Sequence, residues 1–195
     1  MNLPNKITIF RFVCIPILLF TALLQFRYHW TATFIIYLIG CISDKLDGTI
    51  ARKRNLVTDF GKLFDPLADK AFMLAAFLIL INLGWHTELV IILMMIREFL
   101  VAGVRMAAAV EGETIPANIF GKLKTLLQMI SAGVAFFILA VLEKKGETVI
   151  TSAIGFNPPN YLYNYCTVAF WITGVITFIS GIKYLKDGWH LIKTK

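Results

Sequence analysis

Charged side chains are scarce in this sequence. Asp, Glu, Lys and Arg make up 16% of its 195 residues, whereas hydrophobic residues make up 58%. Soluble domains average about 25% charged and about 45 to 50% apolar residues. The shortage of charge excludes an ordinary soluble domain and predicts an integral membrane protein, because each membrane-spanning helix needs about 20 mostly apolar residues.

Cysteine is rare as well, and no platform for nucleic acid is present. Cys14, Cys41 and Cys166 are odd in number and lie in apolar runs, so they indicate packing residues rather than disulfides or a zinc site. Nucleic acid is the alternative interpretation of a basic balance, but no aromatic and basic platform outside the membrane supports it. The net charge of +7 instead fits a cytoplasmic face that meets anionic lipids or phosphorylated substrates.

Six apolar stretches follow one another without an internal repeat or a low-complexity tract. They run from about 7 to 24, 31 to 52, 61 to 83, 88 to 110, 121 to 142 and 161 to 185. Lys6 and Arg11 interrupt the first stretch and no small-x-small cleavage site follows it, so we expect no cleaved signal peptide. The pattern predicts an all-α integral membrane protein, a bundle of six transmembrane helices that forms one domain over residues 1–195.

Lysine and arginine are unevenly divided between the two sets of loops. Six spans put both termini on one side, and that side carries Lys6, Lys53, Arg54, Lys62, Lys122, Lys124, Lys183, Lys186, Lys193 and Lys195. The opposite loops offer only Arg27, Lys144 and Lys145. The positive-inside rule therefore predicts a multi-pass protein of the cytoplasmic membrane, with both termini in the cytoplasm.

Four aspartates interrupt the second and third apolar stretches. Asp44 and Asp47 are spaced i, i+3, and Asp65 and Asp69 are spaced i, i+4, so each pair lines one face of its helix. A charge at a helix centre costs about 2.5 to 3.5 kcal/mol on insertion scales, and four carboxylates in one space repel one another. The arrangement predicts a site for hard cations with oxygen ligands, Mg²⁺ or Mn²⁺, open to the cytoplasm.

Small residues and an arginine accompany the aspartates. Gly48, Ala51 and Gly61 leave the carboxylate faces uncovered, so that a ligand has room there. Four carboxylates balance two divalent cations, and Arg52 offsets the added charge of a bound diphosphate. These residues predict a two-metal diphosphate site in which one carboxylate accepts the proton of an attacking hydroxyl.

The spacing of these residues matches a known signature. From Asp44 to Asp69 the chain reads D-x-x-D-G-x-x-A-R-x(8)-G-x-x-x-D-x-x-x-D, which resembles the motif of the CDP-alcohol phosphotransferases. The resemblance implies an enzyme in which Asp44 and Asp65 contact both metal ions. It further implies that Asp47 binds one ion and that Asp69 binds the other while it accepts the proton. A homodimer is implied in the same way.

The resemblance also implies contacts to the CDP part of the substrate, CDP-diacylglycerol. They would come from Gly48, Arg52 and Thr58. The segment LPNKIT is similar to the opening of the family, and its Asn5 and Thr8 are spaced to hydrogen-bond the nucleotide from the first helix. Asn5 as an ordinary polar residue at a helix end is the alternative.

Four basic residues outside the motif bear on the acceptor alcohol: Arg97, Arg105, Lys122 and Lys124. A basic pocket suits an acceptor that already carries phosphate, and the chain resembles the branch of the family that uses sn-glycerol 3-phosphate. The expected products are CMP and phosphatidylglycerol phosphate. Inositol phosphate, serine and phosphatidylglycerol remain alternative acceptors. A different interpretation is that Arg97 and Arg105 form ion pairs with Glu98. Lys122 and Lys124 would then only anchor a helix end at the membrane surface.

Other interpretations compete with this one. One alternative is that the aspartates form structural ion pairs with Lys45, Lys62 or Lys70, and another is that they bind ions in a small divalent-cation transporter. A metal-dependent prenyl transferase also binds diphosphate through aspartates, although its motifs are usually more widely separated. The aromatic residues of the sixth stretch are expected to face lipid or a second subunit.

Overall fold

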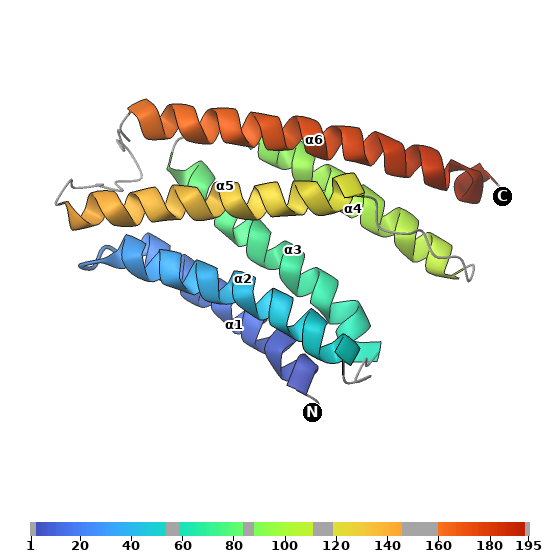
Figure 1. Cartoon of the computed structure of the whole chain (residues 1–195), viewed down its shortest axis with the longest axis horizontal. Helices are drawn as coiled ribbons and strands as arrows, with labels where there is room; N and C mark the ends of the chain where they lie inside the picture. The colour runs from blue at the N-terminus through green and yellow to red at the C-terminus, as the bar shows by residue number, and fades with distance from the viewer. Residues whose placement is uncertain (1–2, 54–58, 84–87, 111–118, 146–159, 194–195) are drawn as a thin grey trace. The chain divides into compact units, whose positions relative to one another are not determined.

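The structure, a computed structural model, describes residues 3–53, 59–83, 88–110, 119–145 and 160–193. Figure 1 shows the helices α1 (Leu3–Leu23), α2 (His29–Lys53), α3 (Asp59–Asn82), α4 (Glu88–Val110), α5 (Ile119–Lys144) and α6 (Asn160–Lys193). The described residues contain no strand, and each predicted apolar stretch coincides with one helix. The prediction of an all-α fold is therefore confirmed.

Apolar side chains cover much of the outer surface of the helices. Phe20 on α1 is 63% exposed, Leu89 on α4 is 61% exposed and Phe178 on α6 is 60% exposed. Within the described residues, Leu123–Lys144 and Asn164–Tyr184 are long and apolar enough to cross a membrane. Exposed apolar side chains on several helices are compatible with a membrane protein, because lipid covers them at no cost in free energy.

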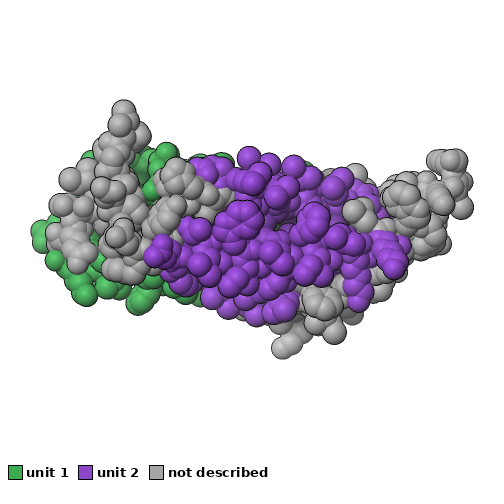
Figure 2. Space-filling view, turned by 90° about the horizontal axis from the view of Figure 1, so that it is seen from above, with its two compact units in different colours: residues 1–84, 132–162 green, residues 85–131, 163–195 purple. Residues whose placement is uncertain are grey.

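The helices fall into two compact units, which Figure 2 distinguishes by colour. Unit 1 comprises residues 1–84 and 132–162, and unit 2 comprises residues 85–131 and 163–195. Unit 1 therefore holds α1, α2, α3, the last part of α5 and the first residues of α6, whereas unit 2 holds α4, the first part of α5 and the rest of α6.

The core of unit 1 is aromatic. The ring of Tyr37 on α2 stacks on Phe72 of α3, with centroids 5.8 Å apart, and lies 5.2 Å from the ring of Phe136 on α5. All three side chains are buried. Gly40 permits this packing, since a Cβ at that position would stand 2.2 Å from Cζ of Phe72. α1 packs against both α2 and α3.

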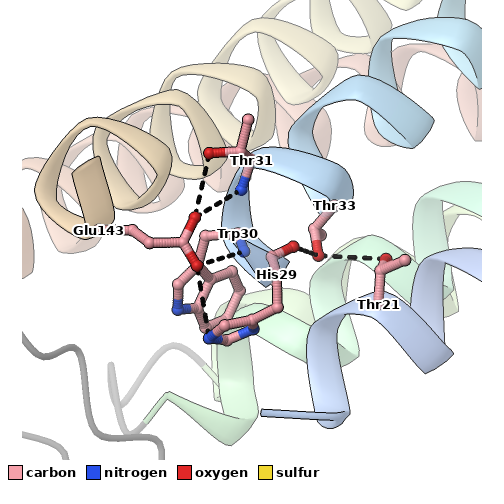
Figure 3. Close-up of polar contacts among 6 residues, drawn as sticks. All are labelled: Thr21, His29, Trp30, Thr31, Thr33 and Glu143. Atoms are coloured by element: carbon pink, nitrogen blue, oxygen red, sulfur yellow. Dashed lines mark hydrogen bonds and ion pairs between the residues drawn. The ribbon is translucent and has the colours of Figure 1, made fainter. Parts of the chain in front are cut away.

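A carboxylate from α5 caps the N-terminus of α2 (Figure 3). Glu143 accepts hydrogen bonds from the backbone N–H of Trp30 at 3.1 Å and from the N–H and hydroxyl of Thr31, both at 3.0 Å. These N–H groups have no acceptor within the helix, and their positive dipole end favours a negative charge. α2 is thereby fixed to α5 at the end opposite the aspartates.

His29 lies beside this cap and precedes the second apolar stretch. Its Nε2 atom is 3.9 Å from Oε1 of Glu143. Burial lowers the pKa of His29, and the nearby carboxylate opposes that shift only in part. The imidazole is therefore uncharged at neutral pH, because burial disfavours its charged form.

Candidate active site

The best-defined part of the candidate site is a contact between α1 and α3. The hydroxyl of Thr8 donates a hydrogen bond to Oδ1 of Asp65. Both residues belong to unit 1, and Thr8 is fully buried. One turn away, the rings of Phe12 and Phe64 meet edge to face at 6.5 Å. The polar contact is thus supported by apolar packing between the same two helices.

The sequence of α1 explains why Thr8 faces inward. Thr8, Arg11, Cys14 and Leu18 recur at helical spacing and are at most 2% exposed. The residues between them, such as Phe10 and Val13, are exposed and apolar. α1 therefore buries a stripe whose N-terminal half is polar, and that half meets α3 where the carboxylates begin.

Asp65 and Asp69 lie one turn apart on α3, on either side of the buried Ala68. Both are half-buried. Asp65 is joined to α1 through Thr8, whereas Asp69 interacts electrostatically with Tyr37 on α2. The acidic face of α3 therefore interacts with both α1 and α2, so residues of three helices meet at this place in unit 1.

Two oxygen-donor carboxylates that are only half-buried fit a hard divalent cation, which keeps part of its water shell. Among the side chains that the structure describes, no three His, Cys, Asp or Glu residues gather as a metal site. The side chains of Asp44, Asp47 and Arg52 are outside that described part, and so are the surroundings of Gly48. The complete four-aspartate site stays a prediction.

The remaining predicted substrate contacts are only partly described. Thr58 lies in the segment 54–58, outside the described residues, and the side chain of Asn5 is also outside them. The same holds for the side chains of Arg105 and Lys122. Arg97 and Lys124 are described, and both are buried in unit 2.

Arg97 and Lys124 share one carboxylate. Nη1 of Arg97 is 3.2 Å from Oε1 of Glu98, and Nζ of Lys124 forms an ion pair with the same oxygen. The alternative of an Arg97–Glu98 ion pair is thus confirmed as a contact. Glu98 thereby holds the two cations side by side on α4 and α5.

Residues on α6 complete this cluster, and the sequence did not indicate them. Nη2 of Arg97 donates a hydrogen bond of 2.7 Å to the hydroxyl of Ser180, and the guanidinium lies over the ring of Tyr184. The expectation that the aromatic residues of α6 face lipid or a second subunit is wrong for Tyr184, which is 3% exposed, whereas Trp171 is exposed. The signal in the sequence that could have indicated this contact is the pair of small residues Ser180 and Gly181, one turn before Tyr184.

Comparison with known proteins decides the family. The family model for CDP-alcohol phosphatidyltransferases matches residues 1–179. The chain belongs to the CDP-alcohol phosphatidyltransferase family. The resemblance that the motif between Asp44 and Asp69 indicated is therefore confirmed, and the enzyme class follows from it.

Individual members of the family align over nearly the whole chain. The CDP-diacylglycerol–glycerol-3-phosphate 3-phosphatidyltransferase of Bacillus subtilis (strain 168) is 34% identical over 99% of this chain and 98% of its own length. The protein of the same name from Rickettsia bellii is 34% identical over 95% and 94%. A probable phosphatidylglycerophosphate synthase of Mycobacterium tuberculosis is 35% identical over 78% and 72%.

Proposed function

We propose that the chain transfers the phosphatidyl group of CDP-diacylglycerol to sn-glycerol 3-phosphate, with CMP and phosphatidylglycerol phosphate as products. The observation that carries this proposal is the similarity, along almost the full chain, to relatives named for that reaction. The Thr8–Asp65 contact supports it, because it joins the nucleotide segment expected on α1 to a carboxylate of the motif on α3.

The four aspartates Asp44, Asp47, Asp65 and Asp69 are the proposed ligands of two divalent ions, Mg²⁺ or Mn²⁺. When bound, such ions withdraw charge from the diphosphate and stabilise the departing CMP. Asn5, Thr8, Gly48, Arg52 and Thr58 are the proposed contacts to CDP-diacylglycerol. The hydroxyl of Thr8 donates a hydrogen bond to Asp65, so the proposed nucleotide contact on α1 lies against the acidic face of α3.

The transfer step follows from the roles of these residues. A hydroxyl oxygen of glycerol 3-phosphate attacks the phosphorus atom that bears the diacylglycerol. A new P–O bond forms, the bond to the CMP phosphate breaks, and the hydroxyl proton passes to Asp69. Asp69 suits this task because it is half-buried and lies one helical turn from Asp65, another proposed metal ligand.

Arg97, Arg105, Lys122 and Lys124 are the proposed contacts to the phosphate of the acceptor. A guanidinium and an ammonium held on one carboxylate present two cations to a single phosphate, and this pairing favours a phosphorylated acceptor over serine. This arrangement supports a phosphorylated acceptor, and the names of the relatives support glycerol 3-phosphate in particular.

The proposed setting is the cytoplasmic membrane. We infer one domain with six spans, both termini in the cytoplasm and the aspartates open to that side, and a homodimer as the assembly. The exposed apolar side chains of α1, α4 and α6 support immersion in lipid. Accessibility of single cysteines placed near residues 2 and 194 to an impermeant thiol reagent tests the orientation, and the mass of the purified protein in detergent tests the dimer.

Purified protein tests the reaction directly. With CDP-diacylglycerol, Mg²⁺ and glycerol 3-phosphate, we expect CMP release, and little or none with serine, inositol phosphate or phosphatidylglycerol as acceptor. CMP release that does not depend on glycerol 3-phosphate would reject the proposed acceptor. Divalent-cation flux in liposomes without nucleotide would favour the transporter alternative instead.

A further inference from the structure

The side chain of Arg97 extends from α4 and contacts α6. It lies on α4 and is 7% exposed. Its Nη2 atom donates to the hydroxyl of Ser180 at 2.7 Å, and its Cζ atom lies 5.6 Å from the ring centroid of Tyr184. A hydrogen bond in the guanidinium plane and an aromatic ring over its face fix both the position and the tilt of the group.

Gly181 makes this close approach possible. A Cβ at that position would stand 2.8 Å from Cγ of Arg97 and 3.4 Å from its Nε atom. Real Cβ atoms do not come so near, so any side chain at 181 displaces the arginine. Ser180, Gly181 and Tyr184 fall within one turn of α6, and we name these three residues the α6 seat.

The seat is itself supported from α5. A Cβ at Gly121, near the start of α5, would meet the Tyr184 ring at 3.5 Å and its hydroxyl at 3.6 Å, so the tyrosine packs directly on that helix. These contacts connect α4, α5 and α6 around one guanidinium. Glu98 holds the other edge of Arg97 and pairs with Lys124.

We infer that Ser180, Gly181 and Tyr184 are positioning residues that set the affinity for the acceptor's phosphate by holding the Arg97 guanidinium in one orientation. The inference rests on the proposed function of Arg97. A planar guanidinium binds a phosphate through two parallel N–H groups, so its orientation decides how well the pair forms. A long side chain that is already ordered also loses less conformational entropy when the anion binds.

A pair of serine and threonine variants on α6 tests the seat. Ser180→Ala removes the hydroxyl acceptor, and we expect the KM for glycerol 3-phosphate to rise about tenfold, in line with the loss of a hydrogen bond to a charged group. The KM for CDP-diacylglycerol should stay unchanged. Ser180→Thr keeps the hydroxyl and should restore the lower KM.

The matched control is Thr173→Ala. Thr173 is also buried on α6, but its hydroxyl donates to the carbonyl of Ala169 within the same helix. Its replacement therefore removes a buried hydroxyl without touching Arg97 in the contacts described, and it should leave both KM values alone. A general loss of α6 packing would instead affect both variants and both substrates.

The outcomes separate the two levels of the proposal. A wild-type protein that releases no CMP with glycerol 3-phosphate contradicts the proposed function. An active wild type whose acceptor KM is the same in Ser180→Ala as in Thr173→Ala overturns the seat alone. If Ser180→Ala cannot be recovered folded, Gly181→Ala decides in the same assay, because its methyl group should displace Arg97 and raise only the acceptor KM.

Discussion

The hydroxyl of Thr8 donates a hydrogen bond to Asp65, and this bond joins α1 to the acidic face of α3. A fully buried hydroxyl and a half-buried carboxylate are paired across 57 residues of sequence. The bond leaves the second carboxylate oxygen of Asp65 for other ligands and fixes the orientation of the group. It therefore links the proposed nucleotide contact and a proposed metal ligand in one pair.

Removing that hydroxyl should weaken metal activation. Thr8→Val is nearly isosteric, and we expect the Mg²⁺ concentration for half-maximal CMP release to rise several-fold, because Asp65 loses the donor that orients it. Thr8→Ser should behave like the wild type. Thr21→Val alters another buried threonine of the same helix and should not change the Mg²⁺ dependence; an equal change in both variants would contradict the role given to Thr8.

The proposed proton acceptor is tested by an isosteric change. Asp69→Asn cannot take up a proton, so we expect the turnover number for CMP release to fall about 10²- to 10⁴-fold, the usual contribution of general base catalysis. Glu88→Gln, which alters a carboxylate in the first turn of α4, is the control. Retained turnover in Asp69→Asn would remove Asp69 as the base.

Metal removal bears on the four aspartates together. Chelation with EDTA should abolish CMP release, and added Mg²⁺ or Mn²⁺ should restore it, whereas Ca²⁺ should restore little because it prefers more ligands at longer distances. Full activity in the presence of excess EDTA would be incompatible with a site of this kind.

Glu143 should matter for stability and not for substrate binding. Glu143→Ala leaves two N–H groups and a hydroxyl at the start of α2 without their acceptor, and we expect a loss of about 1 to 3 kcal/mol in the free energy of unfolding. Glu143→Gln keeps one acceptor oxygen and should fall between. The thermal unfolding midpoint in detergent measures this, and an unshifted midpoint would show that the cap contributes nothing.

His29 should make stability sensitive to acid. Its pKa is lowered in the folded protein, so on acidification the unfolded chain takes up a proton first, from about pH 6.5 downward. Stability is therefore present above that pH and is lost as the pH falls toward the lowered pKa. His29→Gln should flatten the pH dependence of the unfolding midpoint between pH 7 and 5; an identical slope would contradict the assignment.

The local features of this chain were predictable, whereas the contacts between helices were not. The six helices follow from apolar length, and the pairing of Asp65 with Asp69 follows from their spacing within one helix. The contact of Arg97 with Ser180 spans 83 residues and depends on how α4 and α6 are rotated. α6 is apolar nearly all round, so its sequence does not tell the buried Tyr184 from the exposed Trp171.

The cap on α2 illustrates the same limit. Glu143 and Thr31 are 112 residues apart, and neither shows a capping motif in its own segment. Helix N-termini usually find an acceptor in the residue just before them, yet this one is supplied by the end of α5. Only the packing of helices within unit 1 brings that carboxylate to the start of α2.

The most direct test follows labelled glycerol 3-phosphate into lipid. Purified protein in detergent micelles that contain CDP-diacylglycerol and Mg²⁺ should convert the label into a chloroform-soluble phospholipid, with one CMP released for each molecule incorporated. Omission of either CDP-diacylglycerol or Mg²⁺ should leave the label in the aqueous phase. Label that stays in water while the complete mixture releases CMP, or a complete mixture without CMP release, would contradict the proposed transfer.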